Sequence, residues 1–200
     1  MDLPPYIRTD TSEDAVASLE LAAAFFSHAM ADDRYWKWFV VAFHSGIQGL
    51  FALALEGGNG FLVQKPEVTK KMLSAMDLGE GLPEPNMDNF MRLYKKLQVP
   101  GNLRYPDSLP IPESETRELA LESLNNIRNN FLHFNVKGWS IERELIVQRA
   151  AQCLEVAEFV CSASRNILWY EPKNEERVKL ALKSLRQFLP IQQAGKSGDT

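Results

Sequence analysis

The stretch WFVVAFHSGIQGLFALAL, residues 38–55, decides the fold because its apolar sequence is almost unbroken. By length alone it could cross a bilayer. However, His44, Ser45 and Gln48 lie in its middle and its flanks are not strongly basic. Polar side chains at mid-membrane depth are costly without a partner. Because the segment is apolar nearly all round, we expect it to be the buried central helix of a globular core, with no membrane partner.

Apolar residues that recur every three or four positions predict further helices around this one. Strand-like alternation of any length is absent. The expected fold is therefore all-α, an antiparallel four-helix-type bundle. The first predicted helix follows the capping oxygens of Thr11, Ser12 and Asp14 and ends near Met30, and the central helix runs from Asp32 or Asp33 to Glu56. The third is opened by Pro112, Glu113 and Ser114 and ends around Asn135. The fourth is capped by Ser140 and runs from Ile141 to about Trp169, and the last runs from about Asn174 to Leu189.

Residues 57–112 differ from the rest because prolines and glycines recur every few positions. Two short helices are expected there, near PEVTKKMLSAM and MDNFMRLYKKLQ, in an inserted excursion from the core. The GGNG sequence at 57–60 should end the central helix, since glycine readily adopts the left-handed conformation. Residues 1–190 should form a single domain with this excursion, and residues 191–200 should be a disordered tail because they lack apolar content.

The composition favours a soluble chain with no whole-chain signal for nucleic-acid binding, since 22 basic residues meet 26 acidic ones. The N-terminus lacks the basic and apolar regions of a signal peptide, so we expect a cytoplasmic location. Cys153 and Cys161 are eight residues apart, roughly 12 Å along one helix, which is too far for a disulfide within it. A reduced chain is therefore expected.

No metal or cofactor is predicted. A di-iron site in a helical bundle needs Glu-x-x-His pairs, but the residues three before the histidines are Phe25, Val41 and Asn130. Two cysteines and three scattered histidines also lack zinc-site spacing. We expect His44 to be a core histidine hydrogen-bonded to a neighbour, and His28 to be a residue favoured at a helix C-terminus by the helix dipole.

The segment NNIRNNFLHF, residues 125–134, places four asparagines, an arginine and a histidine late in a helix. Asn126, Asn129 and His133 are spaced by three and four, so they share one face. Arg128 and His133 lie about 140° apart around an uninterrupted helix. They would point at the same spot only if the backbone loosens near His133, where the helix is expected to end.

The sequence from Arg128 to His133, RNNFLH, resembles the Arg-x4-6-His motif of the HEPN superfamily of helical domains. The residue after the arginine is polar in many catalytic members, and here it is Asn129. The surroundings are also similar to that family: two long apolar helices precede the motif, which lies near the end of a third, and a long helix follows. The resemblance covers roughly residues 12–169, with residues 57–112 as an insertion.

The resemblance implies a metal-independent endoribonuclease with RNA as its partner, as in toxin-like and defence-associated members. Cleavage of RNA by its own 2′-hydroxyl needs a proton acceptor that is partly neutral at pH 7 and a fixed cation for the phosphoryl oxygens. The candidate catalytic residues are His133 as the acceptor, Arg128 as the cation and Asn129 in support; the candidate substrate-binding residues are Asn126, Asn130 and Lys137.

Family members commonly place two motif copies at a shared cleft, so a chain with one copy is expected to act as a homodimer. Many members instead keep the fold as a non-catalytic module, which here would bind a nucleotide or a protein partner such as an antitoxin. A further alternative is an unrelated bundle, in which the asparagines form a solvated stripe. The cations that could hold an RNA backbone near the motif are Lys137, Arg143 and, in the excursion, Lys70, Lys71, Arg92, Lys95 and Lys96. Their convergence on Arg128 would favour an enzyme, and their scatter a protein partner.

Overall fold

The computed structural model describes residues 6–133 and 138–189, and within them the regular structure is helical. An isolated β-bridge between Gln64 and Met87 accompanies the helices. The expected all-α bundle is confirmed. The helices are α1 (Thr11–Ala29), α2 (Arg34–Glu56), η1 (Phe61–Val63), α3 (Pro66–Leu78), α4 (Phe90–Lys96), η2 (Pro100–Asn102), α5 (Glu115–Leu132), α6 (Arg143–Glu158), η3 (Phe159–Ala163) and α7 (Pro172–Phe188).

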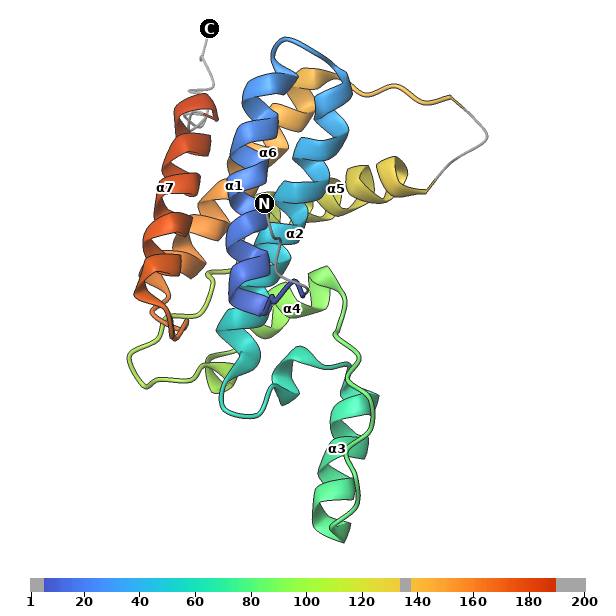
Figure 1. Ribbon diagram of the computed structural model, residues 1–200, viewed down its shortest axis with the longest axis vertical. Coiled ribbons are helices and arrows are strands. Elements are labelled where there is room, and N and C mark those ends of the chain that lie inside the picture. The colour runs from blue at the N-terminus through green and yellow to red at the C-terminus, as the bar shows by residue number, and fades with distance from the viewer. Residues whose placement is uncertain (1–5, 134–137, 190–200) are drawn as a thin grey trace, which may run out of the picture.

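Helix α2 is the centre of the bundle, and α1, α4 and α5 pack on it while α7 packs on α1 and α6 (Figure 1). The helix is long and apolar enough to cross a membrane by length and composition, but 72% of its most apolar 18-residue window is buried. Its apolar side chains are buried against the other helices, so they need no contact with lipid. The prediction of a central core helix is therefore confirmed.

The contact between α1 and α2 is close because glycines of α2 face α1. A Cβ atom at Gly49 would lie 2.6 Å from the Cβ and 3.0 Å from the Cα of Ala15, and one at Gly46 would lie 2.6 Å from Leu19 Cγ. These distances leave no room for a side chain. The glycines thus let the two backbones approach more closely than ordinary residues allow.

The predicted caps of α1 are wrong, because Thr11, Ser12 and Asp14 all lie within the helix. Asp10, which precedes Thr11, is the N-cap, and its side chain accepts a hydrogen bond of 2.8 Å from the Glu13 amide. The N-cap of α5 is Ser114, as expected, and its hydroxyl accepts from the Arg117 amide. Both caps satisfy amides that the first helical turn leaves without a partner.

The predicted helix from Ile141 to Trp169 is too long at both ends. Helix α6 ends at Glu158 and passes through the π-helical turn η3 into a loop. Two buried polar side chains hold this loop: Ser164 Oγ donates to the Leu109 carbonyl at 3.0 Å, and Asn166 Nδ2 donates to the Ala54 carbonyl at 2.6 Å. These tertiary bonds stabilise a non-helical backbone where apolar spacing alone predicts a helix.

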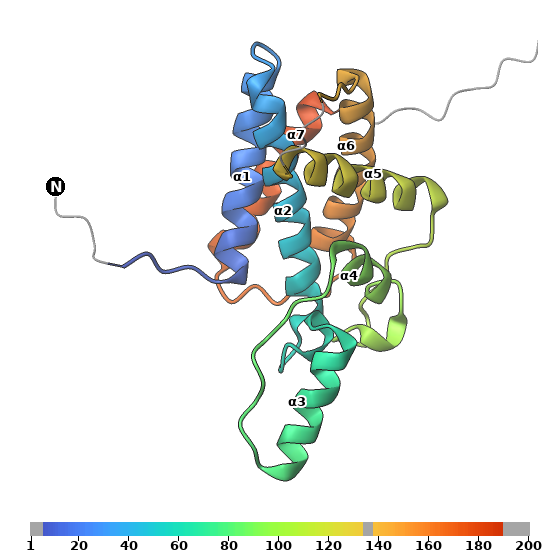
Figure 2. The same cartoon turned by 90° about the vertical axis from the view of Figure 1, so that its right-hand side faces the viewer.

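The segment at residues 57–112 divides into two parts. Helix α3 projects beyond one end of the bundle (Figures 1 and 2), as an excursion should. Helix α4, in contrast, buries Phe90, Leu93 and Tyr94 in the core. This helix was expected outside the core because prolines and glycines recur around it and fully apolar runs are absent, but three buried side chains on one face suffice to dock it. Phe134, Asn135 and the tail at residues 191–200 lie outside the described residues.

Candidate functional site

His133 is the C-cap residue of α5. Its backbone is extended, with φ −87° and ψ 114°, and its amide donates to the Asn129 carbonyl at 2.9 Å. The side chain is exposed. The helix therefore loosens at the histidine, two to three residues earlier than the sequence pattern predicts, and the imidazole is free to meet a ligand from solvent.

Arg128 lies five residues earlier and is half-buried. Its Nη1 donates to Asn129 Oδ1 at 3.0 Å, while its buried Nε has no hydrogen-bond partner in the described part of the chain. Arg128 and Asn129, both candidate catalytic residues, are thus in direct contact. Of the other asparagines, Asn126 and Asn130 are exposed, and Lys137 lies outside the described residues.

His44 on α2 is the neighbour of this segment inside the bundle. It is buried, and its Nε2 donates to Asn125 Oδ1 at 3.0 Å, which confirms the expectation of a hydrogen-bonded core histidine. Its ring packs on Phe90 with centroids 4.2 Å apart. Burial lowers the pKa of His44 to about 4; the bond to Asn125 opposes this shift and the charge of Arg128 adds to it. His44 is therefore neutral at pH 7.

An open cavity of about 420 Å³ lies where the end of α5 meets the N-terminal ends of α2 and α6. His133 and Asn130 line it, and Arg128 is not among its lining residues. The structure thus brings the histidine and Asn130 together, but Arg128 does not line the cavity although the backbone loosens at His133. The remaining lining residues are Asp33, Trp36, Phe131, Trp139, Ile141, Arg143 and Ile146.

Sequence spacing did not connect Asp33, Trp36 or Trp139 with His133, and it identified Arg143 only as one of the few cations near the motif. Arg143 Nη2 lies 2.6 Å from Asp33 Oδ2 in an exposed ion pair that joins α6 to the start of α2. Trp139 is 41% exposed and meets the Phe131 ring edge-on at 4.7 Å. Trp36 is buried, and its Nε1 has no hydrogen-bond partner among the described residues. These groups come together only through the packing of three helices.

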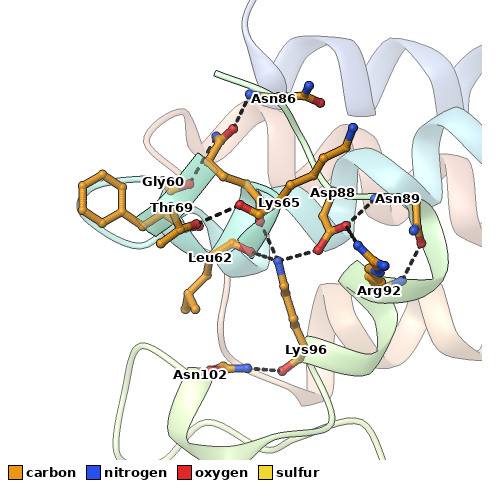
Figure 3. Close-up of polar contacts among 12 residues, drawn as sticks. Gly60, Leu62, Lys65, Thr69, Asn86, Asp88, Asn89, Arg92, Lys96 and Asn102 are labelled. Atoms are coloured by element: carbon orange, nitrogen blue, oxygen red, sulfur yellow. Dashed lines mark hydrogen bonds and ion pairs between the residues drawn. The ribbon is translucent and has the colours of Figure 1, made fainter. Parts of the chain in front are cut away.

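The cations of residues 57–112 do not converge on Arg128. Lys96 forms an ion pair of 2.9 Å with the buried Asp88 and donates to the carbonyls of Leu62 and Gln64 at 2.9 and 2.8 Å (Figure 3). Arg92 lies 3.5 Å from the same carboxylate. Burial alone would raise the pKa of Asp88, but the hydrogen bonds from Lys96 and the Asn89 amide outweigh it and lower that pKa. This cluster secures α4 to η1.

The other cations of that segment are engaged or distant. Lys95 pairs with Glu118 at the start of α5. Lys70 and Lys71 lie on α3, which projects from the end of the bundle opposite the N-termini of α2 and α6 (Figures 1 and 2). A continuous basic surface around the cavity is therefore not built from these five residues.

Cysteines and acidic clusters suggest no further chemistry in the described residues. Cys153 and Cys161 are both free and buried, as the spacing predicts. Burial raises the pKa of both thiols, to about 11 for Cys161, so neither is a ready nucleophile. Within residues 6–133 and 138–189, no group of three or more histidine, cysteine, aspartate or glutamate side chains could hold a metal ion.

Comparisons with models of protein families, with curated proteins and with solved structures give no match. A functional assignment therefore depends on the residues of the site and on their geometry.

Proposed function

We propose that the protein is a metal-independent endoribonuclease of the HEPN type. The observation that carries this proposal is His133, an exposed imidazole at the end of α5 that lines the cavity together with Asn130. The half-buried Arg128, hydrogen-bonded to Asn129, lies on the same helix. An accessible histidine, a fixed guanidinium and amide side chains supply the acceptor, the cation and the hydrogen bonds that RNA cleavage needs.

The proposed reaction uses the 2′-hydroxyl of the RNA as the nucleophile. His133 accepts the hydroxyl proton, the 2′-oxygen forms a bond to the adjacent phosphorus, and the bond from phosphorus to the 5′-oxygen breaks. The leaving 5′-oxygen takes a proton from solvent. The products are a 2′,3′-cyclic phosphate and a 5′-hydroxyl, and the guanidinium of Arg128 stabilises the charge on the phosphoryl oxygens.

The positions of Arg128 and His133 support a homodimer as the active form. Arg128 does not line the cavity that contains His133, so one chain does not direct both side chains into the same space. In a symmetric dimer the same surface of each chain meets its counterpart. A cleft formed by two copies of α5 would offer an arginine from one protomer and a histidine from its partner to the same phosphate.

A second candidate function, a non-catalytic binding module, is supported by the cations. Lys95 and Lys96 are neutralised by carboxylates, and Lys96 is mostly buried. Phosphate contacts supply most non-specific affinity for nucleic acid, and these groups cannot provide them. The partner would then be a nucleotide or a protein such as an antitoxin. In both proposals the chain acts in the cytoplasm, in defence or as a toxin.

Incubation of the purified chain with a mixed cellular RNA pool in EDTA separates the two functions. The nuclease predicts fragments with 2′,3′-cyclic phosphate ends from the wild type and none from His133→Ala. The binding module predicts intact RNA with both proteins. Measurement of the molecular mass by light scattering in the same buffer tests the dimer. Cleavage of RNA by a monomer would show that a cleft shared by two protomers is not needed.

A further inference from the structure

The cavity beside His133 has the size and the lining of a small-molecule site. Its volume of about 420 Å³ falls within the range of about 300–1,000 Å³ that is typical of ligand sites. It is open to solvent and lined both by apolar or aromatic side chains and by polar ones, among them Asp33, His133 and Arg143. Such a combination offers a flat ring both stacking surfaces and hydrogen bonds.

The aromatic residues provide a surface for stacking. Trp139 lines the cavity and is 41% exposed although it packs edge-on against Phe131, so part of its ring is accessible. Aromatic side chains of this kind bind the unstacked bases of single-stranded RNA. Trp36 is a second indole in the lining, but it is 5% exposed and its N–H is buried.

The polar groups at the edge match one base better than the others. The ion pair between Asp33 and Arg143 is exposed on both sides, with side chains 63% and 64% accessible. The carboxylate keeps acceptor capacity for the N1–H and 2-amino donors of guanine, and the guanidinium keeps donors for its O6 and N7 acceptors. Adenine, cytosine and uracil do not present both sets.

We infer that this cavity binds a nucleobase of RNA, preferably guanine, next to the bond that is cleaved. The inference rests on the proposed function for the identity of the ligand as RNA. His133 lines the same cavity as Asp33 and Arg143, so the ribose of a base held there lies near the imidazole. Base binding thereby selects which 2′-hydroxyl is activated.

The test uses the indole signals of the four tryptophans in ¹H–¹⁵N NMR spectra of the full chain. Each of the four nucleoside 5′-monophosphates is titrated separately. Trp36 and Trp139 line the cavity, whereas Trp38 and Trp169 are not among its lining residues and serve as internal controls. The expected result is a saturable shift of the Trp36 and Trp139 signals with 5′-GMP, weaker shifts with the other nucleotides, and unchanged signals from the controls.

Three variants sharpen the result. Trp139→Ala should weaken 5′-GMP binding at least tenfold, read from the Trp36 signal, whereas Trp38→Ala, which removes a similarly exposed ring, should leave it unchanged. Asp33→Asn should remove the preference for 5′-GMP over 5′-AMP. The inference is overturned if no nucleotide shifts the cavity signals, as when a second copy of the chain covers the cavity, or if Trp139→Ala binds as well as Trp38→Ala.

Monophosphates contain no bond for the nuclease to cleave, so this result is independent of the proposed reaction. Guanine-selective shifts in a chain that leaves RNA intact would support the cavity and reject the nuclease. If the chain cleaves RNA but none of the four nucleotides shifts its indole signals, the nuclease proposal stands and the cavity is rejected as a base site.

Discussion

His44 of α2 and Asn125 of α5 are joined inside the bundle by a hydrogen bond of 3.0 Å. Nε2 is the donor, so Nδ1 carries no proton in the neutral ring, and Nδ1 is buried without a partner among the described residues. The bond fixes α5 to the central helix one turn before Arg128. The orientation of the candidate catalytic segment thus depends on a buried polar contact as well as on apolar packing.

The low pKa of His44 makes the stability of the fold depend on pH. The folded-state pKa is about 4 and the usual value is 6.5, so the unfolded chain takes up a proton as the pH falls through 6.5 while the folded chain does not. Each unit of difference is worth about 1.4 kcal/mol. The free energy of unfolding should fall by about 3 kcal/mol between pH 6.5 and pH 4 through this residue.

Urea denaturation of the wild type and of His44→Gln, followed by circular dichroism at several pH values, measures this effect. Glutamine keeps a donor for Asn125 but has no titratable ring. The wild type should lose more stability than His44→Gln over the interval. Parallel curves for the two proteins would show that His44 does not titrate as its burial demands.

Asn125→Ala should destabilise the fold by about 1–3 kcal/mol, since it leaves the His44 Nε2–H buried without an acceptor. Asn126→Ala is the matched control: the neighbouring side chain is exposed, and its removal should change stability by no more than about 0.5 kcal/mol. Thermal denaturation of both variants checks the difference. Equal effects would mean that the bond contributes nothing to the attachment of α5.

Lys96→Met should destabilise the fold by about 3–5 kcal/mol, because it leaves the fully buried carboxylate of Asp88 without its main counter-charge. Lys95→Met removes the adjacent lysine, whose side chain is 50% exposed in its pair with Glu118. That pair is worth about 1 kcal/mol or less. Chemical denaturation should therefore show a larger loss of stability for Lys96→Met than for Lys95→Met. Similar losses of stability in the two variants would contradict the structural role of Lys96.

Gly49→Ala should cost about 1–3 kcal/mol, because the added methyl group would meet the backbone of Ala15 and force α1 and α2 apart. Gly58→Ala adds the same methyl group where no atom lies within 4 Å, so it should be nearly neutral or mildly stabilising. The two melting temperatures provide the comparison. A neutral Gly49→Ala would show that the helices can separate without loss.

The elements that could be predicted from the sequence are those whose signal is local. The apolar run of α2, the glycines after it and Ser114 before α5 each act within a turn or two of the chain, and the structure confirms them. The end of α6 could not be predicted in this way. It depends on the bonds of Ser164 to Leu109 and of Asn166 to Ala54, whose partners are distant in sequence.

The same distinction between local and long-range signals applies to the candidate site. Helical periodicity predicts that Arg128 and His133 point in different directions, and it locates His44 in the core. Arg143 could be identified as one of the few cations near the motif, but Asp33 and Trp139 were not predicted, because they reach the end of α5 only when α2 and α6 pack beside it. Trp139 lies near a predicted loop, and Asp33 and Arg143 lie at the starts of two different helices. No sequence spacing therefore connects the three residues.

The most direct test of the central claim is the rate at which His133→Ala cleaves RNA in EDTA, compared with wild type and with His28→Ala. His28 is an exposed histidine in the last turn of α1, so its replacement controls for the loss of a surface imidazole. Circular dichroism of each protein must show an intact helical fold. Our account predicts cleavage by wild type and His28→Ala, with 2′,3′-cyclic phosphate ends, and none by His133→Ala. Equal cleavage by all three proteins, or by none, would contradict it.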